Sequence, residues 1–412
     1  MYKLLHGLRI IEAASFIAAP SCALHFQQFG ADVIRCDPIG GGPDFRRWPR
    51  AANGHSFYWE GLNKGKKSVA INLTTPAGKA LLQRLVTAPG PDAGLFVTNF
   101  PAEGFLSHDR LIQHRADLIT ARVMGWASGA TALDYTVNSA VGIPQMTGPA
   151  SLGDEPVNHV LPAWDIAAGL YAAFALLAAD RARRQTGQGT EIRLPLGDVA
   201  MAFMGHLGQI GEVSETGKDR PRYGNDLFGS FGRDFRTRDG RRIIVIALTG
   251  HQWKDLVDTL SLNEAVAAIE TELCVDLSSD EGLRFCHRDR LNPIVADAIG
   301  RISLDELKVR FEGTKVCWGP YNTLSEAVGD PDLISERNPL FSAVDHLTDT
   351  RYLTPGAAAS LGGFERGTPG RAPVLGEHTE EVLADVLGMA SCEIAALHDA
   401  GTVAGPAGSK AL

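Results

Sequence analysis

A single carboxylate, Asp165, carries the clearest chemical signal in this sequence. It stands just before an almost wholly apolar run at 166–179, and a run of that length without a polar face predicts a buried helix. An acid in the first turn of such a helix lies near a dry interior while it faces the positive end of the helix dipole. This environment suits a carboxylate that must stay ionised but poorly solvated, as a nucleophile in covalent catalysis must.

Asp is also a favoured N-cap residue, so Asp165 could serve helix initiation alone. His159 lies shortly before it and could act as a general base or be an ordinary loop histidine. The sequence contains no G-x-S-x-G motif that would supply a serine nucleophile instead. Two roles for Asp165 therefore stay open, a helix cap and a nucleophile.

A group of basic residues in the first 70 positions offers a second candidate site, for an anion. The segment NKGKKS at 63–68 precedes a predicted strand, Arg35 ends another, and Arg46 and Arg47 stand between them. Ammonium, guanidinium and backbone N–H groups could together hold phosphates. A solvated turn is the alternative for the segment at 63–68, and composition alone favours it.

Several other classes of site are not indicated. The first strand is not followed by G-x-G-x-x-G, and there is no P-loop, which argues against a nicotinamide or nucleotide enzyme. Cys286 and His287 have no second pair at ligand spacing, so we expect no metal. A formal net charge of −9 argues against a general nucleic-acid binder.

The expected location follows from cysteine usage and hydropathy. The six cysteines form no C-x-x-C pair or disulfide framework, which favours a reducing cytoplasm. The N-terminus lacks the features of a signal peptide, and no uninterrupted apolar segment reaches the length of a membrane span. We therefore expect a cytoplasmic protein that does not act at a membrane.

The elements that must position these residues alternate between strand and helix patterns. Strands are predicted at 8–13, 32–36, 68–73, 94–99, 118–123 and 191–194, and helices at 20–29, 76–87, 165–184 and 197–212. This rhythm predicts an α/β fold, a Rossmann-like parallel sheet with helices on both faces. A hairpin at 228–247, turning at Asp239 and Gly240, opens a smaller α+β domain.

The composition divides the chain further. We expect a large domain at 1–205, a linker at 206–225 and the small domain at 226–325. The Pro-, Gly- and Ala-rich stretch at 326–376 reads as a long connection, after which 377–412 returns to the large domain.

Together these patterns resemble the family III CoA-transferases, over 7–200 and again over 223–253. The segments that carry the resemblance are GLRIIE at 7–12, GADVIR at 30–35, NKGKKS at 63–68, INL at 71–73, TNFP at 98–101, MTG at 146–148, and Asp165 with its apolar helix. The resemblance implies that Asp165 is the nucleophile and passes through an aspartyl-CoA thioester. It also implies an interlocked homodimer and no permanently bound cofactor, with coenzyme A entering as part of an acyl-CoA substrate.

The resemblance assigns further roles residue by residue. The positions implied to bind CoA are Ala18, Arg35, Lys66, Ile71, Asn72, Thr74, Asn99 and Phe100. A phosphate-binding Arg that many members carry is replaced here by Ser107, so phosphate contacts must be arranged differently. Gly224 and Asn225 are candidates for an oxyanion loop, and His159 and Arg222 are candidates to hold a second substrate carboxylate. The racemase branch is disfavoured because its catalytic His and Glu fall near Leu133 and Gly250.

Closer similarity suggests the reaction. The segments DPIGGG at 37–42, NHVLPAWD at 158–165 and LGEHT at 375–379 resemble a member that moves CoA between the two carboxyl groups of one C-methylated dicarboxylate, mesaconyl-CoA. The alternatives are an intermolecular transferase, which uses separate donor and acceptor acids, and a catalytically silent CoA- or nucleotide-binding protein.

Overall fold

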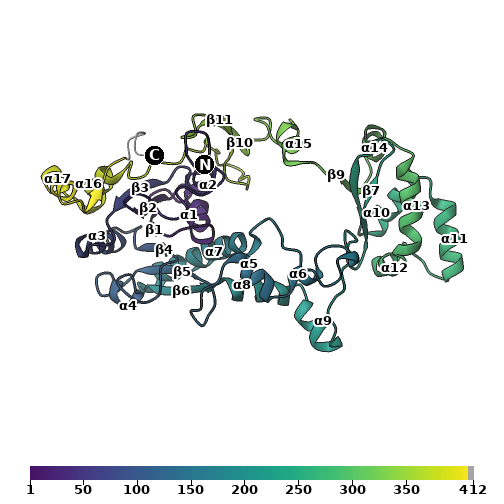
Figure 1. Cartoon of the computed structure of the whole chain (residues 1–412), viewed down its shortest axis with the longest axis horizontal. Coiled ribbons are helices and arrows are strands. Elements are labelled where there is room, and N and C mark those ends of the chain that lie inside the picture. The colour runs from purple at the N-terminus through teal and green to yellow at the C-terminus, as the bar shows by residue number, and fades with distance from the viewer. Residues whose placement is uncertain (407–412) are drawn as a thin grey trace. The chain divides into compact units, whose positions relative to one another are not determined.

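The computed structural model describes residues 1–406, and its first compact unit is built on a seven-stranded sheet (Figure 1). The strand order is β12-β3-β2-β1-β4-β5-β6, and all neighbours are parallel except β12, which pairs antiparallel with β3. The strands are β1 Arg9–Ala13, β2 Asp32–Pro38, β3 Lys67–Ile71, β4 Leu95–Thr98, β5 Ile119–Met124, β6 Thr190–Pro195 and β12 Val403–Ala404. The order 3-2-1-4-5-6 is that of the doubly wound Rossmann fold, so the predicted fold class is confirmed.

Helices cover both faces of this sheet (Figure 1), which explains why its strands read as continuous apolar runs. Successive side chains alternate between the faces: Ile10 belongs to the core under α1, α7 and α8, and Ile11 to the core under α3, α16 and α17. The bounds are α1 Ala18–Gln28, α3 Pro76–Val86, α7 Ala163–Thr186, α8 Leu196–His206, α16 Thr379–Leu387 and α17 Ser391–Asp399. Short helices α2 Phe57–Asn63, α4 His108–Leu111 and α5 Asp134–Ala140 occupy the connections.

The packing of α7 on α1 depends on one glycine. A Cβ added at Gly169 would lie 2.0 Å from Ser21 Oγ and 2.9 Å from the carbonyl oxygen of Ala18. Only a residue without a side chain therefore allows the second turn of α7 to lie against the first turn of α1. This close approach brings the beginnings of the two helices together.

The second compact unit comprises Gly142–His159 and Glu212–Gly329. Its antiparallel sheet has the order β7-β8-β9, with β7 Phe231–Arg236, β8 Arg242–Ala247 and β9 Cys317–Pro320. The turn predicted at Asp239 and Gly240 is present, and Gly240 has a φ of +80°, which favours glycine. The helices are α10 Gly250–Thr259, α11 Asn263–Leu273, α12 Glu281–Cys286, α13 Arg288–Gly300, α14 Leu304–Phe311 and α15 Leu324–Gly329.

Residues 142–159, expected within the large domain, group with this second unit. They carry α6 Ile143–Met146 and the 3₁₀ turn η1 Ala150–Leu152. Arg222 explains the grouping, because its buried guanidinium donates to the carbonyl oxygens of Thr147 at 2.8 Å and of Glu155 at 2.5 Å. The helix predicted at 197–212 is divided, since α8 ends before Gly208, at φ +77°, and α9 Gln209–Thr216 follows.

The chain from Asp330 onward belongs to the first unit. The stretch expected to be a plain connection contains a hairpin, β10 Phe341–Asp345 with β11 Arg351–Pro355. The buried Glu60 of α2 holds this hairpin, because its carboxylate accepts the Leu347 N–H at 2.7 Å and lies 3.0 Å from His346 Nδ1. The returning segment is thus fixed to the first unit by polar contacts between residues that are far apart in the sequence. A local sequence pattern does not reveal such contacts.

Candidate active site

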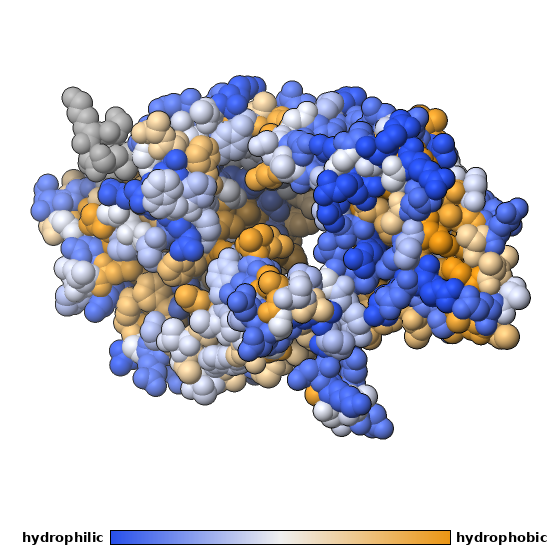
Figure 2. Space-filling model, turned by 45° about the vertical axis from the view of Figure 1, so that its right-hand side comes forward, coloured by the Kyte–Doolittle hydropathy of each residue, from blue (hydrophilic) through white to orange (hydrophobic). Residues whose placement is uncertain are grey.

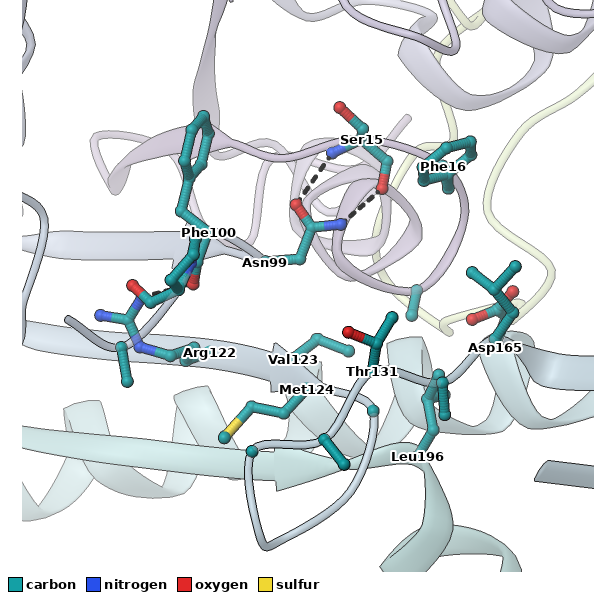
Figure 3. A pocket seen from close by; sticks show the side chains of 18 of the residues that line it. Ser15, Phe16, Asn99, Phe100, Arg122, Val123, Met124, Thr131, Asp165 and Leu196 are labelled. Carbon is teal, nitrogen blue, oxygen red and sulfur yellow. Dashed lines mark hydrogen bonds between the residues drawn. The ribbon is translucent and has the colours of Figure 1, made fainter. Parts of the chain in front are cut away.

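The first unit contains a cavity of about 580 Å³ at the carboxyl ends of its central strands (Figure 3). The loops that follow β1, β4 and β5 line it, together with Asp165 from α7 and Leu196 from α8. The strand order reverses between β1 and β4, and ligands of open α/β sheets bind in the crevice at such a switch point. The topology therefore places Asp165 where this class of sheet binds its ligands.

Asn99 fixes the loops on either side of the switch point. Its side chain accepts the Ser15 N–H at 3.1 Å and donates to the Ser15 carbonyl oxygen at 2.9 Å (Figure 3). The buried Arg122 of β5 holds the next part of the wall, because it donates to the carbonyl oxygens of Phe100 at 2.7 Å and Pro101 at 2.9 Å. Side chains from β5 and from the loop after β4 thus hold the cavity wall through contacts to its backbone.

The helix cap beside Asp165 is supplied by a different acid. Asp134, buried at the start of α5, accepts the backbone N–H of Trp164 at 2.7 Å and of Asp165 at 3.1 Å. Asn138 accepts the Trp164 indole N–H at 3.1 Å, so α5 holds the first turn of α7 at two points. The N-cap position itself is Pro162, which offers no side-chain acceptor.

This arrangement shows that Asp165 does not serve as the helix cap. Its carboxylate caps no backbone group, and it makes no hydrogen bond or ion pair within residues 1–406. It faces the cavity instead (Figure 3). A half-buried carboxylate without a protein partner is placed to react with a ligand rather than to support the fold.

The surroundings raise the pKa of Asp165 to about 6. Burial is the largest cause, because it disfavours the charged form, and the neighbouring Asp134 carboxylate adds like-charge repulsion. The Arg47 guanidinium acts in the opposite direction. Asp165 is therefore ionised at neutral pH while it remains poorly solvated, an environment that increases the reactivity of a carboxylate.

Phe16 marks strain in the cavity wall. Its φ of +69° is uncommon for a residue with a bulky side chain and is sustained only where the surroundings impose it. The Phe16 N–H donates to Asp44 Oδ2 at 3.2 Å, and the same buried carboxylate accepts from Arg35 at 2.9 Å. The loop after β1 is thus held by a buried ion cluster that includes Asp44 and Arg35.

That cluster contains two of the residues predicted to bind CoA. Arg35 is 0% exposed, with its guanidinium engaged by Glu12, Asp37 and Asp44. Lys66 is 2% exposed and donates to Glu12 at 2.7 Å. Neither charge is open to a ligand in this structure, since both are already compensated inside the fold. The positive charges that suggested phosphate binding instead pair with buried carboxylates. One of these carboxylates, Asp44, also holds the loop that carries Phe16.

The other predicted CoA positions divide into two groups. Ala18, Asn99 and Phe100 line the cavity together with Asp165. Ile71 is 0% exposed inside the core and does not line the cavity. Asn72 and Thr74 do not line the cavity, because Asn72 donates to the Gly401 carbonyl oxygen and accepts from the Thr74 hydroxyl at 2.6 Å.

The four predicted substrate residues, His159, Arg222, Gly224 and Asn225, all belong to the second unit. Arg222 is buried on backbone carbonyls and is not free to hold a carboxylate in this structure. Gly224 has a φ of +64° and its N–H donates to Gly148, while Asn225 donates to Asp234 at 2.9 Å. Oxyanion binding by the loop at 224–225 stays a prediction.

Sequence reasoning missed Asp134, Phe16 and Arg47. Asp134 stands far from the helix that it caps, so no local motif connects them. The positive φ of Phe16 arises from a tertiary contact and has no signature in residue type. Arg47 was noted only as part of a basic group. Within residues 1–406, His, Cys, Asp and Glu side chains form no cluster suited to a metal ion.

Comparison with known proteins gives concordant results. A family model described as CoA-transferase family III matches residues 5–379. The 2-methylfumaryl-CoA isomerase of Chloroflexus aurantiacus is 47% identical over 408 residues, which cover 98% of this chain and 99% of that protein. The succinyl-CoA–L-malate CoA-transferase beta subunit of the same organism is 28% identical, covering 95% of this chain and 96% of that protein.

A solved structure supports the fold. The crystal structure of a CAIB/BAIF family protein from Brucella suis has a TM-score of 0.76 at 22% identity, covering 94% of this chain and 100% of that one. The α/β architecture with its large parallel sheet is therefore shared with that protein.

Proposed function

The chain belongs to CoA-transferase family III, and from this membership we propose that it moves CoA between the two carboxyl groups of one mesaconyl-CoA molecule. The observation that carries the proposal is the Asp165 carboxylate, which lies without a protein partner in a cavity at the switch point of the sheet. The relative of 47% identity, named as a 2-methylfumaryl-CoA isomerase, supports the choice of this substrate.

The reaction proceeds through covalent intermediates on Asp165. A carboxylate oxygen attacks the thioester carbonyl, the C–S bond breaks, and a mixed anhydride and CoA thiolate form. The thiolate attacks the aspartyl carbonyl, so that the anhydride C–O bond breaks and free mesaconate and an aspartyl-CoA thioester result. The other carboxylate of mesaconate then attacks the aspartyl carbonyl and expels the thiolate, which attacks the new anhydride and regenerates the Asp165 carboxylate. No proton or electron is gained or lost overall.

The proposed roles follow the positions of the residues. Ala18, Asn99 and Phe100 contact the CoA arm, since they line the cavity beside Asp165. Coenzyme A enters with the substrate, and the protein acts in the cytoplasm.

We also propose a homodimer, on the apolar face of α7. Leu170 and Phe174 on this helix are 53% and 71% exposed, and Figure 2 shows apolar patches of this kind at the surface on the face drawn. By length and composition α7 could cross a membrane, and 28% of its most apolar window is buried within the chain. A second copy would cover this face, in keeping with the interlocked dimer that the family resemblance implies.

The test uses mesaconyl-CoA labelled in one carboxyl carbon. The enzyme alone should convert it to the isomer with CoA on the other carboxyl, and hydroxylamine added during turnover should modify Asp165, detected by peptide mass spectrometry. The Asp165→Ala variant should do neither. Absence of both isomerisation and modification in the wild type would contradict the proposal and leave a silent CoA-binding protein.

An intermolecular transferase is the second candidate, favoured by the 28% identical succinyl-CoA–L-malate relative. Unlabelled mesaconyl-CoA is incubated with labelled free mesaconate, succinate or malate. Intramolecular transfer predicts that the CoA ester stays unlabelled while it isomerises. Rapid appearance of label in the ester would support the intermolecular reaction instead.

A further inference from the structure

Arg47 is a cation without a counter-ion beside the cavity. Its guanidinium makes no hydrogen bond or ion pair with any side chain in the described part of the chain. It stacks on two aromatic rings, with its central carbon 5.4 Å from the centre of the Phe16 ring and 5.2 Å from that of Tyr58. Phe16 lines the cavity together with Asp165 (Figure 3), so the stack fixes a positive charge at the edge of this cavity.

Tyr58 adds a hydrogen-bond donor at the same place. Its hydroxyl oxygen is buried and has no hydrogen-bond partner among residues 1–406. Buried hydroxyl groups are rarely left unpaired, so an orphan of this kind marks a position that a ligand or solvent atom fills. Burial raises the pKa of Tyr58, and the hydroxyl therefore stays protonated and able to donate.

From these two groups we propose that Arg47, assisted by the Tyr58 hydroxyl, holds the carboxylate of the dicarboxylate that is not bonded to CoA. The proposal rests on the proposed function and names the side chains that select a dicarboxylate over a monocarboxylate. A guanidinium stacked on two rings keeps its N–H groups in a fixed plane, which suits the two oxygens of a carboxylate.

Charge balance during the reaction supports this role. In the free enzyme Asp165 is a nearby anion, and Arg47 lowers its pKa against the effect of burial. Once Asp165 becomes an anhydride or a thioester, its charge is lost and no longer balances the charge of Arg47. The spare carboxylate restores the balance, so the anchored state is stabilised most when the covalent intermediate is present. Exchange of the two substrate ends between Arg47 and Asp165 would then reorient mesaconate within the cavity.

Arg50 provides a matched control. It lies in the same segment, is exposed, and also stacks on an aromatic ring, with its central carbon 5.4 Å from the centre of the Trp48 ring. Trp48 does not line the cavity, and 72% of it is exposed. Arg50→Gln thus removes the same charge from the same stretch of chain without touching the proposed anchor.

The experiment compares mesaconyl-CoA with methacrylyl-CoA, which has the same acyl skeleton but no second carboxylate. Adduct formation at Asp165 is measured by hydroxylamine trapping in single turnovers. Arg47→Gln should lower the second-order rate constant with mesaconyl-CoA by about 10- to 100-fold, the range for a charge-assisted hydrogen-bonded pair. Measured at pH 8, well above the pKa of about 6 of Asp165, Arg47→Gln should leave the rate with methacrylyl-CoA nearly unchanged. Tyr58→Phe should show a smaller loss with the same selectivity. Arg50→Gln should behave as the wild type with both thioesters.

An equal loss of rate with both thioesters, or no loss of rate with either, would contradict the proposed role of Arg47. Calorimetric titration with free mesaconate tests the same site without any chemistry, so the outcome does not depend on the proposed function. The wild type and Arg50→Gln should bind mesaconate at least tenfold more tightly than Arg47→Gln. Equal affinities of all three proteins would contradict the proposal, whereas a binding difference without any Asp165 adduct would contradict the proposed function alone.

Discussion

At the residue scale, two neighbouring acids divide the work of the active site. Asp134 provides the helix cap and stays buried in backbone hydrogen bonds, and Asp165 keeps its oxygens free toward the cavity. The cap therefore leaves the carboxylate of Asp165, the proposed nucleophile, without a backbone partner. The negative charge of Asp134 also raises the pKa of Asp165, so the two functions are electrostatically coupled.

This coupling predicts the acid limb of the pH profile. Because the pKa of Asp165 is raised to about 6, kcat/KM should fall as pH decreases through about 6. Asp134→Asn keeps an oxygen acceptor for the helix but removes the charge, so the midpoint should move to lower pH. The profile is measured by initial isomerisation rates from pH 4.5 to 8. An unchanged midpoint in Asp134→Asn, with Asp305→Asn as a surface control, would count against the coupling.

The same shift predicts a cost in stability. Since the folded pKa of Asp165 lies above its value of about 3.9 in an unfolded chain, ionisation destabilises the fold as pH rises through this interval. Asp165→Asn should therefore increase the free energy of unfolding at pH 8 by up to about 3 kcal/mol, a gain that disappears near pH 4. Urea titrations at the two pH values measure the difference. A gain that is equal at both values would assign the effect to packing instead.

At the element scale, the approach of α7 to α1 decides where Asp165 lies. Gly169→Ala places a Cβ 2.0 Å from Ser21 Oγ and forces the helices apart. Although Ala favours helices by up to about 1 kcal/mol, overpacking of this kind typically costs 1–3 kcal/mol, so we expect net destabilisation and a loss of adduct formation at Asp165.

The matched change is Gly205→Ala in α8, where the added Cβ would make only an ordinary contact, 3.6 Å from Ile210. This variant should be as stable as the wild type or more so, and should react normally. Thermal unfolding and hydroxylamine trapping are measured on both proteins. Equal stability of the two glycine variants would show that α7 and α1 can separate freely.

The elements also show how far the sequence can be interpreted. The central strands and α7 were predicted because each is a continuous apolar run. Such a run can be recognised from the sequence without knowledge of the tertiary contacts. The hairpin β10–β11 was missed because its segment is rich in Pro, Gly and Ala and is stabilised by the distant Glu60. The buried pairing of Arg35 and Lys66 could not be predicted for the same reason, since their partner Glu12 is contributed by another strand.

At the scale of the whole molecule, the proposed dimer makes α7 an internal helix. Phe174→Asp should weaken self-association, because a charge would be buried in an apolar interface. Analytical ultracentrifugation should find a dimer for the wild type and a larger monomer fraction for the variant. Val309→Asp in α14 is the control, since Val309 is equally exposed at 71%. A wild-type monomer, or binding of the wild type to lipid vesicles, would contradict the dimer and favour another covering for α7.

The arrangement of the cavity has a consequence for divergence between related enzymes. Its floor is the buried sheet, in which most substitutions are costly, while its walls are short loops after β1, β4 and β5. Substitutions at a few residues of these loops can therefore change which acid the enzyme accepts without changing the sheet. We therefore expect a relative that keeps Asp134 and Asp165 to keep the proposed covalent chemistry while its acid selectivity changes through residues of the loops.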